Sequence, residues 1–295
     1  MRFKVVDLKL PEDKTFAVCL THDIDQIKKT YQFLTYGLRA LKRKDIKNFS
    51  YHVSSVALRN HYWTFDKIAD IEKKKKVKST FFFMTQKETM NPLKLYSWSS
   101  FGFYDMSNPR IVDVIKKLDK GGWEIGLQAS SYSGTNKEQM RNEKEKLEAV
   151  LGKKVAGVRH HLLRIDEKIT WNIHSDVGFQ YDSSFGFKDA LGFRDGICKP
   201  FKPLNGNDFV VLPIALMDII LFKISKDRED AWERCLKIID EAENKHAVLN
   251  VLWHNSSFNE DEYPYLTFMY EKIIDECKKR GAMFATSAQI ANSLR

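Results

Sequence analysis

The chain has 295 residues, of which 43% are hydrophobic and 13% aromatic, enough to bury the core of one large α/β domain. Its net charge of +9 admits nucleic acid or acidic glycans as partners but selects neither. Cys19, Cys198, Cys235 and Cys277 lie far apart without a Cys-x-x-Cys pair, which excludes a disulfide framework and a thiolate zinc site.

The first third of the chain predicts two buried strands with helical sequence between them. The first strand begins at the apolar run Phe16–Leu20 and ends in the polar cluster Thr21–Asp25. Helices are expected over 26–47, continuing over 49–59, and over 66–75, before a second strand at 77–84. The long aromatic stretch 85–107 is either a functional loop or a loop that packs its own aromatic side chains.

The rest of the chain alternates between helices and strands. Helices are predicted at 109–118, 137–151, 166–175, 228–244, 265–280 and 288–294, and strands at 123–128, 155–161, 178–182, 209–214, 247–253 and 282–286. Neither an internal repeat nor a linker interrupts the pattern, so we expect one domain over residues 1–295. Alternation predicts parallel strands with right-handed crossovers, and seven or eight such units favour a closed or nearly closed barrel.

Polar side chains follow several of these strands. Because barrels of this kind gather their chemistry at the carboxyl ends of the strands, we expect the side chains to meet at one rim. Each has an ordinary alternative, such as a helix cap, a turn or a loop-fixing ion pair, but their number favours a functional site. The candidates are His22, Asp23, Asp25, Gln128, Tyr132, Arg159, His160, His161, Arg164, Asp218, His254 and Asn255.

Side-chain alternation sorts the neighbouring candidates. Asp23 and Asp25 point the same way on an extended chain, so the two carboxylates need a cation, a shared proton or a separating turn. Alternatively, Asp25 caps the helix predicted from residue 26. The same alternation points His22 away from Asp23 and lets at most one of His160 and His161 reach the site.

Seven segments in this order resemble the polysaccharide deacetylase family, carbohydrate esterase family 4 with its NodB-homology domain, and more narrowly a divergent branch of it. The segments are LTHDID, EIGL, GVRHH, YDSSFGF, GFRDG, LPIALMD and LWHN, within a resemblance that runs from about residue 16 to 286. The resemblance implies a distorted (β/α)7-type barrel and metal-dependent hydrolysis of an N-acetyl or related amide group on a carbohydrate.

The resemblance also implies roles for individual residues. Asp23 matches the general base, His254 in the closing Leu-x-His motif matches the general acid, and Arg159 falls where an arginine orients the base. Asp25 takes the role of a metal ligand. The expected substrate contacts are Tyr132, Arg164 and Trp253.

One departure from the family pattern concerns the metal. The family's second motif supplies two histidines four residues apart, and the EIGL segment places them at Gln128 and Tyr132. Glutamine is a weak neutral oxygen ligand, and tyrosine rarely binds zinc. The expected ligands of a divalent metal, zinc first among them, are then Asp25, Gln128 and His161.

Three outcomes follow from this departure. His161 or His160 supplies the missing imidazole, the site holds a harder or weaker metal through Asp25, Gln128 and waters, or the metal is absent. In the last case the chain is a pseudo-deacetylase that binds a glycan without cleaving it.

Carbohydrate is therefore the expected partner. We identify no nucleic-acid recognition module, no stretch that approaches a membrane span, and no apolar run over residues 1–6 of the kind a secretion signal has. These features predict a cytoplasmic protein that has no membrane span and does not bind nucleic acid.

Overall fold

The computed structural model describes residues 3–29, 32–42, 44–54, 62–85, 103–203 and 208–294. Most of the predicted loop at 85–107 and part of the predicted helix at 49–59 lie outside these residues. Within them, no helix is long and apolar enough to cross a membrane.

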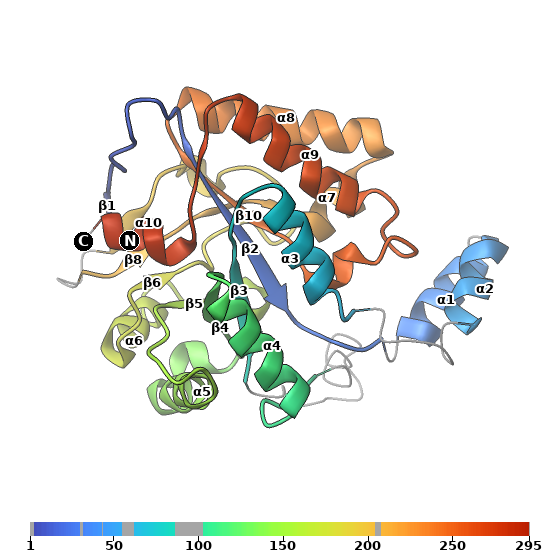
Figure 1. Ribbon diagram of the computed structural model, residues 1–295, viewed down its shortest axis with the longest axis horizontal. Coiled ribbons are helices and arrows are strands. Elements are labelled where there is room, and N and C mark those ends of the chain that lie inside the picture. Colours follow the sequence, from blue (N-terminus) through green and yellow to red (C-terminus); the bar gives the residue numbers. More distant parts are fainter. Residues whose placement is uncertain are drawn as a thin grey trace.

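One curled sheet forms the centre of the molecule (Figure 1), with parallel strands in the order β8-β6-β5-β4-β3-β2-β10-β9. The strands are β2 (Ala17–Ile24), β3 (Thr80–Met84), β4 (Glu124–Ala129), β5 (Gly157–His160), β6 (Tyr181–Asp182), β8 (Val210–Val211), β9 (Ile214–Met217) and β10 (Val248–Leu252). Every residue of β2, β3 and β10 is buried, as expected for parallel strands covered on both faces.

Strands β8 and β9 belong to one stretch of chain on either side of Pro213. Strand β8 pairs with β6, whereas β9 pairs with β10. Proline has no N–H for a sheet ladder, so the stretch can change neighbours at this residue. It thereby joins the two ends of the parallel sheet and forms the distorted (β/α)7-type barrel that the sequence predicts.

Three short strands lie beside the ring. β1 (Phe3–Val5) and β7 (Phe201–Pro203) pair antiparallel, and β7 pairs with β8. β11 (Met283–Phe284), which the sequence predicts, pairs with β2. The sequence does not predict β1 and β7, because three residues are too few to establish an alternating pattern.

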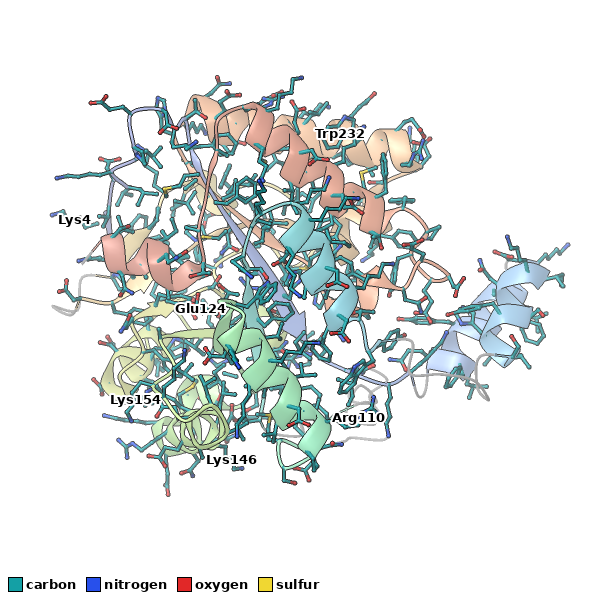
Figure 2. All side chains as sticks on the ribbon, in the orientation of Figure 1. Lys4, Arg110, Glu124, Lys146, Lys154 and Trp232 are labelled. Carbon is teal, nitrogen blue, oxygen red and sulfur yellow. The ribbon has the colours of Figure 1, made fainter. Side chains whose placement is uncertain are left out.

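Helices surround the strands (Figure 1), and Figure 2 shows their side chains filling the space against the sheet. They are α3 (Phe65–Lys74), α4 (Pro109–Lys120), α5 (Lys137–Leu151), α6 (Thr170–Val177), α7 (Asp218–Ile224), α8 (Arg228–Asn244), α9 (Leu266–Lys279) and α10 (Ser287–Ser293). The α5 helix begins where the Asn136 side chain accepts a hydrogen bond from the backbone N–H of Gln139, and ends at Gly152, whose φ is 78°.

The helix predicted from residue 26 begins later. Helix α1 (Gln32–Lys42) starts six residues further along, and α2 (Ile46–Ser54) is a separate helix after a turn at Lys44, whose φ is 59°. Asp25 is therefore not a helix cap. The α1–α2 hairpin projects from the side of the barrel where β2 ends (Figure 1).

A buried lysine attaches this hairpin to the barrel. The Lys29 ammonium forms an ion pair with Glu262, in the loop after β10, and lies 2.7 Å from His52 Nδ1 on α2. Burial lowers the pKa of Lys29, although Glu262 opposes this effect. The contact connects α2 to the loop after β10 at the carboxyl end of the barrel.

Candidate active site

A cavity of about 650 Å³ opens at the carboxyl end of the barrel. Gln32 and Tyr36 on α1 form part of its wall. Five residues predicted for the site line it as well, and these are Asp23, Asp25, His161, Arg164 and His254. The base and the acid implied by the resemblance therefore lie on the same cavity.

Asp23 is held by a buried arginine from β5. Arg159 Nη1 donates to Asp23 Oδ1 at 2.9 Å and to Thr21 Oγ1 at 2.8 Å. Its Nε and Nη2 donate to the carbonyl and hydroxyl oxygens of Ser183 at 2.7 and 2.6 Å. With both its donor edges occupied, the guanidinium has a fixed orientation and holds the carboxylate in place.

His254 is held by a buried carboxylate. Its Nδ1 lies 2.7 Å from Asp218 Oδ1, and its backbone N–H donates to Asp218 Oδ2 at 2.5 Å. Since a carboxylate accepts, Nδ1 carries a proton, and Nε2 remains directed toward Asp25 Oδ2 at 3.8 Å. The imidazole therefore has a fixed orientation, with Nε2 on the cavity side.

Burial and nearby charges shift both groups. Burial raises the pKa of Asp23, and the positive charge of Arg159 opposes this rise. Burial alone would lower the pKa of His254, but the charge and hydrogen bond of Asp218, with Asp25 and Asp23, raise it to about 10. His254 is therefore protonated at neutral pH and can donate a proton.

No protein-family model matches this sequence, and no curated protein matches it. Several solved structures do match. One described as a polysaccharide deacetylase from Mycobacterium smegmatis has a TM-score of 0.62 at 17% identity, over 99% of this chain and 94% of that chain. The chain has the polysaccharide deacetylase fold.

Proteins with different descriptions share this fold. PuuE allantoinase matches with a TM-score of 0.58 at 15% identity, over 96% of this chain and 91% of that chain. A mutant of BA3943, a CE4 family pseudoenzyme with restored enzymatic activity, matches with a TM-score of 0.51 at 13% identity, over 95% of this chain and 68% of that chain. The fold alone therefore does not establish an activity.

The expected metal ligands gather around Asp25. His161 Nε2 lies 3.9 Å from Asp25 Oδ1, and Gln128 Nε2 donates to the same oxygen at 2.5 Å. Gln128 Oε1 is buried and has no hydrogen-bond partner within the described part of the chain. The structure therefore directs the amide nitrogen of Gln128, and not its oxygen, toward Asp25, and Gln128 is fully buried and does not line the cavity.

This donor set fits a divalent cation that prefers oxygen ligands better than it fits zinc. One carboxylate and one imidazole, joined by an amide oxygen once the Gln128 side chain turns it toward Asp25, suit magnesium or manganese, whereas tight zinc sites combine several imidazoles or thiolates. Among the described residues, no group of three His, Cys, Asp or Glu side chains is placed to hold a metal. The expectation of zinc in the first instance is therefore not supported by the donors present.

Two of the expected substrate contacts lie elsewhere. Trp253 has no exposed surface, and its ring packs 5.6 Å from that of Tyr270 on α9, so it belongs to the core; this corrects the prediction. Tyr132 is 48% exposed but does not line the cavity. Arg164 lines the cavity, and its contact with substrate stays a prediction.

Side-chain alternation along the strands correctly predicts which of these histidines face the cavity. His161 faces the cavity, whereas His160 is fully buried and its Nε2 lies 2.9 Å from His174 Nε2. His22 points away from Asp23 toward Glu72, whose Oε1 lies 2.9 Å from His22 Nε2. The His22 ring Nδ1 lies 2.8 Å from the Trp253 carbonyl oxygen, which links β2 to the residue that precedes the acid.

The resemblance assigns Arg159 to the base, but the sequence does not reveal the groups that fix Arg159 and His254. Asp218 is a candidate because it follows a predicted strand within the segment LPIALMD, yet nothing in the sequence pairs it with His254. Thr21 and Ser183 lie within the segments LTHDID and YDSSFGF, but nothing local in the sequence indicates that both bind one guanidinium. The available sequence signal for these three residues is their position next to a strand end, and this signal is weak.

Proposed function

We propose that this chain is a single-domain hydrolase that removes an N-acetyl or related amide-linked group from a carbohydrate. The observation that carries the proposal is the pair of groups on one cavity, Asp23 and His254, each held by its own buried partner. One is a carboxylate with a raised pKa, and the other is an imidazole that stays protonated at neutral pH.

These two groups suit the two proton transfers of amide hydrolysis. Asp23 removes a proton from a water molecule, whose oxygen attacks the amide carbon, and the raised pKa of Asp23 makes its carboxylate a stronger base. His254 then donates a proton to the departing nitrogen, which otherwise leaves poorly. Because Arg159 and Asp218 fix both groups, little reorganisation is needed during the reaction.

The residues around Asp25 are the place for a divalent cation. Asp25, His161 and Gln128 would hold it, and a cation there would lower the pKa of a water molecule and stabilise negative charge on the amide oxygen. The separation of 3.9 Å between His161 Nε2 and Asp25 Oδ1 supports this assignment, because one cation between these two atoms could contact both.

The shape of the cavity suits a sugar. Its volume of about 650 Å³ lies within the range of small-molecule sites. Tyr36, Tyr62 and Tyr263 line it, and aromatic rings with a polar tip can pack against a sugar face while binding its hydroxyl groups.

A second candidate is a pseudo-deacetylase that binds the sugar without cleaving it. The observation in its favour is Gln128, which stands where the family motif has a metal-binding histidine. The two candidates differ in turnover and agree in sugar binding.

Release of acetate from N-acetylglucosamine oligosaccharides tests the proposal. The assay is run with Mg²⁺, Mn²⁺ and Zn²⁺ in turn, on the native chain and on Asp23→Asn and His254→Gln. Asp113→Asn, an exposed change on α4, is the matched control. We expect the control to keep native activity and the two site variants to lose at least about a hundredfold.

The outcomes separate the two candidates. Full activity in Asp23→Asn or His254→Gln would remove that residue from the mechanism. Oligosaccharide binding by calorimetry without acetate release under any of the metals would favour the pseudo-deacetylase.

A further inference from the structure

Two cationic side chains stand at the mouth of the cavity. Arg164 follows the turn after β5, and Lys188 lies in the loop after β6. Both are exposed, both line the cavity, and both also line a shallow adjoining pocket of about 240 Å³. No residue that the structure describes forms an ion pair with Lys188.

The backbone that presents Arg164 is strained. Leu162 and Leu163 both have positive φ, at 58° and 49°, a conformation that costs a non-glycine residue about 1–2 kcal/mol. Leu163 is buried in a cluster with Ile214 and Leu252, which holds the turn. As a result His161 and Arg164, three residues apart, both line the same cavity.

The floor and the mouth of the cavity differ in how their charges are paired. At the floor, Asp23 is 3% exposed and forms an ion pair with Arg159, and the partly exposed carboxylate of Asp25 lies 3.8 Å from His254 Nε2. Arg164 and Lys188 carry positive charge at the mouth. A ligand with a single anionic group would therefore place that group at the mouth and its neutral amide near the floor.

We propose that the carbohydrate bound here carries an anionic group, a phosphate or a carboxylate, which Arg164 and Lys188 bind. The guanidinium fork of arginine matches two oxygens of either group, and lysine adds a point charge. The identity of the ligand as a carbohydrate rests on the proposed function, whereas the anion site does not. The pair also orients the substrate, because it binds the anionic end at the mouth of the cavity.

Binding of matched probes tests the proposal by calorimetry. N-acetylglucosamine is the neutral probe, N-acetylglucosamine 1-phosphate carries a phosphate on the same core, and N-acetylmuramic acid carries a carboxylate on it. Inorganic phosphate is the probe without a sugar. We expect at least one anionic sugar to bind at least about tenfold more tightly than the neutral sugar, and the better of the two identifies the anion.

Substitutions assign the effect to the two side chains. In Arg164→Gln/Lys188→Gln the preference should disappear, so that the ratio of the affinities for the anionic and the neutral sugar falls to about one. Lys116→Gln/Lys237→Gln, which removes two exposed charges from α4 and α8, should keep the preference. Thermal unfolding of each variant shows whether it is folded.

Each outcome either supports or overturns the proposal. Equal affinity for all three sugars overturns it, and so does an anion preference that survives in the Arg164→Gln/Lys188→Gln variant. Phosphate binding that this variant loses, without binding of any sugar, supports the anion site and contradicts the carbohydrate assignment. Acetate release from a neutral oligosaccharide with no anion preference supports the proposed function and overturns the anion site.

Discussion

The carboxylate of Asp218 accepts two hydrogen bonds from a single residue, His254. One comes from Nδ1 at 2.7 Å and the other from the backbone N–H at 2.5 Å. Asp218 stands at the start of α7, directly after β9, whereas His254 follows β10, so the contact joins two neighbouring strand ends. It fixes which ring nitrogen of the histidine is free to face the cavity.

Asp218→Asn should lower the pKa of His254 from about 10, because it removes the charge of Asp218, the leading contribution that raises this pKa against burial. An NMR titration of the imidazole measures the change. The alkaline limit of any hydrolytic activity should move to lower pH by the same amount. Asp113→Asn is the control, and a His254 pKa that does not fall in Asp218→Asn would contradict the assignment.

The free energy of unfolding should decrease as pH rises from about 6.5 to about 10. His254 binds its proton in the folded chain up to about pH 10, whereas in the unfolded chain it loses the proton near pH 6.5. Its contribution is thus complete below pH 6.5 and is lost as pH rises through its folded pKa. Urea unfolding at several pH values in this range should show that the free energy of unfolding decreases more steeply with pH for the native chain than for Asp218→Asn. Equal slopes for the two chains would refute the prediction.

Arg159→Met should destabilise the fold by about 3–5 kcal/mol at pH 7, because it leaves the buried Asp23 carboxylate without its counter-charge. Adding Asp23→Asn to this variant should recover part of the lost free energy of unfolding, since no unpaired buried charge then remains. The four urea unfolding curves of this double-mutant cycle give the coupling. Strictly additive effects would show that the two side chains do not act as a pair.

Gln128→His should tighten zinc binding, because it adds an imidazole beside Asp25 and His161. Calorimetry of the metal-free chain with Zn²⁺ measures the affinity, and Mn²⁺ serves as the comparison metal. Asn142→His, at an exposed position on α5 outside the cavity, controls for an added surface histidine. Unchanged zinc affinity would show that residue 128 does not face the metal position.

Much of the fold could be predicted because the signals that specify it are local. The α5 and α8 helices occupy the predicted ranges 137–151 and 228–244, since each has a side-chain N-cap and, for α5, a glycine at the other end. The predicted start of the α1 helix, residue 26, is wrong because a continuous apolar pattern does not show at which residue the chain changes from extended to helical. Nor does the pattern show that a second helix begins at Ile46.

The sequence by itself determined which residues stand at the strand ends, because strand, helix and turn signals depend on neighbours a few positions away. Only the tertiary structure decided their partners: Arg159 binds Asp23 across 136 positions and Asp218 binds His254 across 36. It also directed Trp253 into the core and placed the amide nitrogen of Gln128 against Asp25. The physical reason is that a buried polar group takes whichever partner the curvature of the sheet brings within reach, and that curvature is set by all the strands together.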